Sequence, residues 1–102
     1  MASFDRGETV ICSIEIKDST GAYKDPSDDI ASPSTHTKIT ISDHQNGVEV
    51  NAVGMTRDSI GKYHYDWAST STDLCGRYTV LYKATDDSRI TIETDTFELE
   101  ER

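Results

Sequence analysis

The segment Arg77–Thr85 reads RYTVLYKAT, and its side chains largely alternate between polar and apolar types. The side chains of a β-strand point to opposite faces in turn. One face of this segment therefore carries Tyr78, Val80, Tyr82 and Ala84. The segment Lys62–Ala68 reads KYHYDWA and repeats the pattern, with Tyr63, Tyr65 and Trp67 on one face. Both segments predict strands that bury an aromatic face, and no segment has the period of a long helix.

The same alternation predicts the other strands. We expect them at Thr9–Lys17, Thr37–Ser42, Val48–Ala52, a short stretch around Met55, and Arg89–Glu100. The inward residues of the first two are Val10, Cys12, Ile14, Ile16, Ile39 and Ile41. Asn46-Gly47 is a dipeptide typical of tight hairpins, so we predict a hairpin over His44–Gly47.

Two stretches depart from simple alternation. The segment 25–34 is polar and contains two prolines, which predicts a loop with a short or edge strand near Ile30, since proline cannot donate to a ladder. In the last strand, Ile90 and Ile92 have one parity whereas Phe97 and Leu99 have the other. A single register cannot bury both pairs, so we expect a bulge or break near residues 94–96. Two carboxylates on one face of that strand, Glu98 and Glu100, are expected to protect a sheet edge.

The length of 102 residues is that of one domain, so we expect residues 1–102 to form a single domain. Hydrophobic residues make up only 34% of the chain, which suits a sandwich in which alternate strand residues face inward. About seven short strands with turn signals between them favour an antiparallel β-sandwich. A small barrel such as the OB-fold is the alternative.

The charge balance favours protein partners. Ten Lys and Arg against 19 Asp and Glu give a net charge of −9, which disfavours nucleic acid and anionic membranes and suits a basic partner or simple solubility. No apolar run approaches the roughly 20 residues of a membrane helix, and the N-terminus lacks the apolar core of a signal peptide. These features predict a virion or cytoplasmic location, or the cell surface if the chain is an excised domain.

Short motifs add a resemblance. Gly76-Arg77-Tyr78-Thr79-Val80 follows a polar loop and resembles the penultimate strand of bacterial, archaeal and viral immunoglobulin-like domains. Gly61–Trp67, Gly7–Val10, Asp18–Gly21 and Asp25-Pro26 also look like segments of those domains. The resemblance implies an immunoglobulin-like sandwich in which Tyr78 seals the corner between strands. It departs from antibody domains at Val80, where these carry their second cysteine.

The candidate reactive groups include two cysteines and three histidines. Cys12 and Cys75 are expected to be reduced, with a disulfide between them as the alternative, and neither has zinc-site spacing. The histidines, His36, His44 and His64, are isolated in sequence. The chain has no nucleophile elbow and no phosphate-binding glycine loop. We therefore expect no enzymatic activity and no cofactor.

Loop residues supply the remaining candidates. Weak calcium candidates are Asp18, Asp25, Asp28 and Asp29, whose spacing does not match an EF-hand. Tyr23, His44 and Asn46 are candidate contact residues in interaction loops. The resemblance implies a structural or interaction module, and we expect a subunit or accessory protein of the decoration, tail or adaptor type in a larger assembly such as a virus particle. The first alternative is a cell-surface adhesion or ligand-binding repeat, with or without stabilising calcium. The second is an enzyme built on a sandwich, which would need a pocket with convergent carboxylates or histidines.

Overall fold

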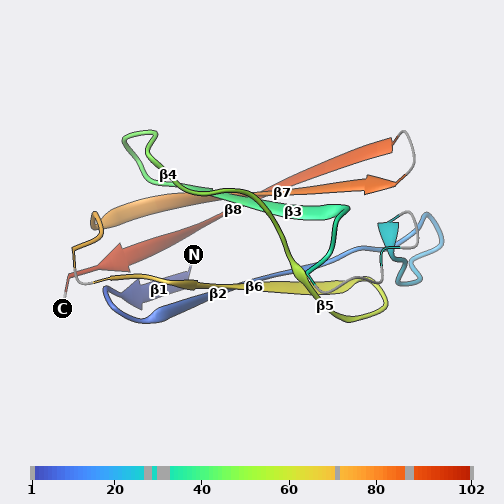
Figure 1. Ribbon diagram of the computed structural model, residues 1–102, viewed down its shortest axis with the longest axis horizontal. Helices are drawn as coiled ribbons and strands as arrows, with labels where there is room; N and C mark the ends of the chain where they lie inside the picture. The colour runs from blue at the N-terminus through green and yellow to red at the C-terminus, as the bar shows by residue number, and fades with distance from the viewer. Residues whose placement is uncertain (1, 27–28, 30–32, 71, 87–88, 102) are drawn as a thin grey trace.

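The computed structural model describes residues 2–26, 29, 33–70, 72–86 and 89–101. Eight strands in these residues form two facing sheets, and the molecule measures 42 × 22 × 21 Å (Figure 1). The strands are β1 (Ala2–Asp5), β2 (Thr9–Glu15), β3 (Thr37–Ser42), β4 (Val48–Gly54), β5 (Thr56–Ser59), β6 (Lys62–Ala68), β7 (Gly76–Asp86) and β8 (Arg89–Glu100). The all-β prediction is confirmed. Within the described residues, no helix is long and apolar enough to cross a membrane.

One sheet is mixed and the other is antiparallel. The larger sheet has the order β1-β8-β7-β3-β4, and the smaller has the order β2-β6-β5. Every pair of neighbours is antiparallel except β1 and β8, which run parallel from Ala2 beside Phe97 to Asp5 beside Glu100. The expectation of purely antiparallel sheets is wrong at this pair. The strand β1, which the alternation did not predict, belongs to the larger sheet, and the turn at residues 6–8 passes the chain to β2 in the smaller one.

The core lies between the sheets and is rich in aromatic rings. Its buried members are Val10, Cys12, Ile39, Ile41, Val50, Met55, Tyr63, Trp67, Tyr78, Val80, Tyr82, Phe97 and Leu99. The Tyr78 and Phe97 rings stack with centroids 5.1 Å apart, and Trp67 lies 5.3 Å from Tyr78. The predicted inward faces of β2, β3, β6 and β7 are therefore confirmed, with Ile14, Ile16 and Tyr65 packed at the margin of the core.

The predicted bulge in the last strand is wrong. The strands β7 and β8 pair without a register shift from Gly76 beside Leu99 to Asp86 beside Arg89. The two apolar pairs point to opposite faces of the sheet. Phe97 and Leu99 are buried, whereas Ile90 and Ile92 remain 56% and 57% exposed. Residues 89–95 are exposed on both faces, so the smaller sheet does not cover this half of β8 and no core is available there.

The predicted role of Glu98 and Glu100 is also wrong. Glu98 pairs with β1 on one side and with β7 on the other. Glu100 pairs with β1. In the described residues, β1 pairs only with residues 97–100 of β8. Residues 89–96 therefore form the open edge of β8, and its carboxylates are those of Glu93 and Asp95.

The hairpin between β3 and β4 is confirmed, but its loop is longer than a two-residue turn. The Asp43 carboxylate accepts hydrogen bonds from the amides of Gln45 and Gly47, each at 2.8 Å. Asn46 has a φ of 66°, whereas Gly47 is not in the left-handed region. The short strand expected around Met55 is β5, which begins one residue later. The strand expected near Ile30 lies outside the described residues.

Candidate functional site

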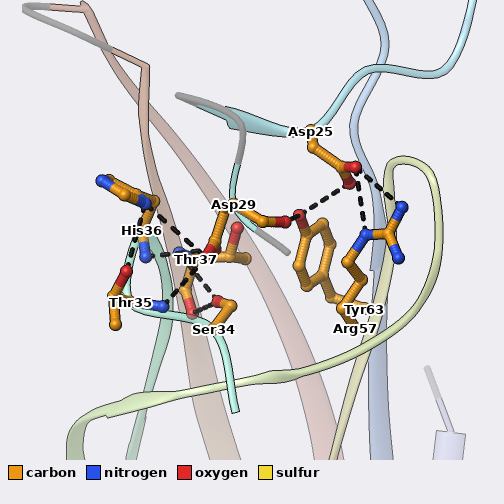
Figure 2. Close-up of polar contacts among 8 residues, drawn as sticks. All are labelled: Asp25, Asp29, Ser34, Thr35, His36, Thr37, Arg57 and Tyr63. Carbon is orange, nitrogen blue, oxygen red and sulfur yellow. Dashed lines mark hydrogen bonds and ion pairs between the residues drawn. The ribbon is translucent and has the colours of Figure 1, made fainter. Parts of the chain in front are cut away.

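A buried polar cluster joins the long loop after β2 to β5 and β6, with Asp25 at its centre (Figure 2). The Asp25 side chain is 11% exposed, accepts a hydrogen bond from Arg57 Nε at 3.0 Å and forms an ion pair with Arg57 Nη2 at 2.9 Å. The Gly61 amide and the Tyr63 hydroxyl also donate to it, at 2.9 and 2.8 Å. Burial alone would raise the pKa of Asp25, but these donors outweigh it and lower the pKa.

The second half of this cluster is built around Asp29. Its two carboxylate oxygens accept hydrogen bonds from the amides of Thr35 and His36, each at 3.1 Å, and the His36 ring lies 3.6 Å away. The Tyr63 hydroxyl approaches the Asp29 carbonyl at 3.2 Å, which links the two halves. Burial would raise the pKa of Asp29, but hydrogen bonds from residues 34–36 lower it. The charged groups of this cluster therefore hold the long loop after β2 in place.

The calcium candidates are not brought together as a set. Asp18 is exposed, and one of its carboxylate oxygens accepts hydrogen bonds from Thr20 and Ala22, so it organises its own turn. Asp25 and Asp29 point into the buried cluster, and Asp28 lies outside the described residues. In the part of the chain that the structure describes, no three His, Cys, Asp or Glu side chains are grouped so that they could hold a metal ion.

The predicted contact residues lie at opposite ends of the sandwich. Tyr23 is 40% exposed, and its ring lies 5.1 Å from Lys17 Nζ and 4.8 Å from Lys62 Nζ. His44 and Asn46 belong to the β3–β4 turn, which lies at the other end in Figure 1. The His44 ring is 3.1 Å from the Cys75 carbonyl and covers Gly76, where an added Cβ would lie 2.7 Å from His44 Cδ2. Tyr23 and His44 therefore already take part in contacts within the chain.

One histidine has the acidic neighbour that an enzyme would need. His64 Nδ1 lies 2.7 Å from the Asp58 carboxylate, and Ser13 stands opposite His64 across β2 and β6. A Ser-His-Asp arrangement also needs a nucleophile in hydrogen-bond contact and donors for an oxyanion. In the described residues no hydrogen bond joins Ser13 to His64, and neither hollow described below is lined by His64. The pair lies on an open sheet face.

The hollows formed by the described residues include the following two. The first, here called the seam groove, lies between β2 and β8 and is lined by residues of both strands and by Val80 and Tyr82 of β7. The second has a volume of about 280 Å³ and lies beside the loop after β2. Its lining includes Lys24 and Asp86, which form an ion pair at 2.6 Å and so neutralise one another.

Both cysteines are free, in agreement with the prediction. Cys12 lies on β2 and lines the seam groove, while Cys75 lies in the loop before β7. Burial, and then the charge of Asp95, raises the pKa of the Cys12 thiol to about 11. A thiol with so high a pKa is a poor nucleophile at neutral pH, because the thiolate is the reactive form.

The sequence did not lead us to expect a site at residues 89–96 of β8, which form its open edge. Ile90 and Ile92 lie on the outer face of the larger sheet, beside the open edge of β8. An uncovered edge strand offers unpaired amides and carbonyls to another chain. The signal that could have found it is the conflict of parity in the last strand, which indicates that one apolar pair lies outside the core.

Comparison with known proteins finds no match for this chain among family models, curated proteins or solved structures. The candidate site is therefore defined by the geometry of this chain. It consists of the open edge of β8, the exposed isoleucines beside it and the seam groove along it. An edge of this kind offers unpaired main-chain groups to an extended polypeptide.

Proposed function

We propose that this chain is a non-enzymatic interaction module with an immunoglobulin-like fold, which serves as a subunit or accessory protein of a larger assembly. A decoration, tail or adaptor protein of a virus particle is the role that we favour, in the virion or the cytoplasm. The observation that carries the proposal is the pair of exposed isoleucines, Ile90 and Ile92, beside the open edge of β8. A strand edge of this kind is a common means by which proteins add a partner strand.

The strand order supports the immunoglobulin-like part of the proposal. Immunoglobulin-type sandwiches place strands B, E and D in one sheet, and C, F and G in the other with C′ added in variable domains. Assigning β2 to β8 in order to B, C, C′, D, E, F and G reproduces both sheets, with β1 beside G.

Two side chains add to that support. The Tyr78 hydroxyl donates to the Leu74 carbonyl at 2.6 Å, as in the corner tyrosine of immunoglobulin folds. Cys12 lies on the B-like strand, at the place of the first inter-sheet cysteine, while Val80 stands two residues after Tyr78, at the place of the second. The tryptophan differs, because Trp67 lies on the E-like strand β6 and not on the C-like strand.

The exposed isoleucines are the residues to test. We would measure the molar mass of the native protein by light scattering and identify the structural proteins that co-purify with it from its source. The double variant Ile90→Lys/Ile92→Lys should lose the assembly, because charged side chains cannot be buried in an apolar contact. Ile60→Lys is the matched control, since Ile60 is also 56% exposed but lies at the β5–β6 turn.

The same measurement separates the proposal from its rival. Wild-type protein and the Ile60→Lys variant should both be captured with coat, tail or other structural proteins. A monomer that captures none of these and gains thermal stability from calcium would overturn the proposal and favour the cell-surface repeat. Thermal melts of both variants should stay close to wild type, because the substituted side chains are exposed.

A further inference from the structure

The seam groove marks a place where the two sheets are not closed against one another. Its floor is formed by core side chains, including Val10, Val80 and Phe97, and its walls include Ile11 on β2 and Asp95 on β8. The strand β1 closes the seam only alongside residues 97–100 of β8. Beyond that point the groove opens between the two sheet edges, while the core side chains that line it stay only 1% to 5% exposed.

The size of the groove indicates what it can hold. Its volume is about 120 Å³, which is the liquid share of about four waters at roughly 30 Å³ each. Small-molecule pockets usually measure about 300–1,000 Å³, so the groove is too small for most such ligands. An apolar floor of this size suits one apolar side chain.

Main-chain groups lie along both sides of the groove. In the described residues, β2 pairs only with β6, and residues 89–96 of β8 pair only with β7. Each strand therefore has a side on which no neighbouring strand is present. A strand that enters along the seam can hydrogen-bond to such an edge and insert alternate side chains toward the core.

The charge of the groove is acidic. Asp95 lines it, Glu93 follows on the same face of β8, and no Lys, Arg or His is among its lining residues. The raised pKa of the Cys12 thiol has burial as its first cause, followed by the charge of Asp95, and Asp66 also contributes. A second copy of the chain would bring Asp95 against Asp95 and add to a net charge of −9, so self-pairing is disfavoured.

We propose that the seam groove binds an extended, basic segment of a partner protein, which adds as a strand to the open edge of β8 and inserts one apolar side chain into the groove. The inference rests on the proposed function and specifies its partner. Every second residue of the added strand shares the core-facing side of the sheet with Asp95 and Glu93, so one of these residues is the apolar one that enters the groove and the next ones along that face are cations.

The test uses the full chain and two blocked peptides of about eight residues, each with threonine at every second position. The other positions carry one central valine, flanked by lysine in one peptide and by glutamate in the other. Binding is measured by calorimetry and located by amide chemical shifts. We expect the lysine peptide to bind, to shift amides of residues 89–96, and to bind less tightly as salt is added. The glutamate peptide should bind at least about tenfold more weakly.

Two variants with equal changes of charge complete the test. Asp95→Lys should weaken the lysine peptide by at least about tenfold and improve the glutamate peptide. Asp58→Lys is the control, because Asp58 lies on β5, at the far edge of the smaller sheet. Its effect on either peptide should be less than about threefold, since charges beyond a Debye length of about 8–10 Å are screened.

Three results would overturn the inference. The first is equal binding of the two peptides, or binding of neither. The second is a set of shifts outside the seam, and the third is a dimer of the chain that occupies the seam without peptide. If Ile90→Lys/Ile92→Lys abolishes assembly while Asp95→Lys changes neither assembly nor peptide binding, the proposed function stands and the groove inference fails. If wild-type protein never assembles, the proposed function fails by itself.

Discussion

Replacing Asp25 by alanine should be among the most destabilising single changes at the polar end of the sandwich. The substitution removes an acceptor that serves the Arg57 guanidinium, the Gly61 amide and the Tyr63 hydroxyl. Gly61 and Tyr63 are buried, so solvent cannot readily replace the lost carboxylate at those two donors. The loop after β2 would lose its main attachment to β5 and β6.

The size of the effect can be bounded from these contacts. Hydrogen bonds to a charged group contribute about 1.5–3 kcal/mol each, and removing one partner of a buried ion pair costs about 3–5 kcal/mol. The contributions around one carboxylate are not additive. Arg57 is 24% exposed and can rehydrate, and the Tyr63 hydroxyl retains the Asp29 carbonyl at 3.2 Å. We therefore expect Asp25→Ala to cost about 3 kcal/mol, or about 12–24 °C in Tm at about 4–8 °C per kcal/mol.

Urea unfolding followed by the fluorescence of Trp67, the single tryptophan, measures this change. The control is Asp58→Ala, which also removes a carboxylate in contact with another side chain, His64 Nδ1 at 2.7 Å, but the Asp58 side chain is 48% exposed. Exposed pairs contribute about 0–1 kcal/mol, so the control should lose less than about 1 kcal/mol. Equal losses in the two variants, or a loss below about 1 kcal/mol for Asp25→Ala, would refute the reasoning.

Three further predictions concern pH, the corner tyrosine and the thiols. The folded-state pKa of Asp25 is lowered, so its contribution is present above the unfolded value of about 3.9 and is lost as the pH falls through the folded value. The urea midpoint should therefore fall less steeply with acid in Asp25→Asn than in wild type, and parallel curves would contradict this. Tyr78→Phe removes the hydrogen bond to the Leu74 carbonyl and should cost about 1 kcal/mol in the same assay; no measurable loss would show that water replaces the hydroxyl. Iodoacetamide at about pH 8 should label Cys75 in the folded protein and spare Cys12, whose thiol is buried with a pKa of about 11, while concentrated urea exposes both to labelling as counted by mass spectrometry.

The strands were predictable from sequence where burial imposes alternation. The segment Arg77–Thr85 alternates because every second side chain packs against the opposite sheet, and the same holds for β2, β3 and β6. The strand β1 was not predictable in this way. Its four residues, ASFD, alternate between apolar and polar types, but so short a run does not distinguish a strand from a loop, and its pairing with residues 97–100 joins segments far apart in the sequence. Such pairing is set by tertiary packing and not by local preference.

The site was less predictable than the fold. The acidic loop suggested ligands for an ion, but Asp25 receives its donors from residues 32 to 38 positions away, which no local spacing reveals. The expected bulge in β8 failed for a related reason, because it assumed that all four apolar residues must be buried. The structure instead exposes Ile90 and Ile92, since their side chains lie on the outer face of the larger sheet, which no other sheet covers in the described residues.

The parallel pairing of β1 with β8 has a mechanical consequence. Four residue pairs join these strands, from Ala2 beside Phe97 to Asp5 beside Glu100. Tension applied between residues 2 and 100 would pull the two strands in opposite directions along their axes, so the pairs would bear the load together in shear. The β7–β8 hairpin, pulled apart at its open end, would instead release its pairs one after another. The short first strand therefore acts as a clamp, which would let the domain transmit force without unfolding.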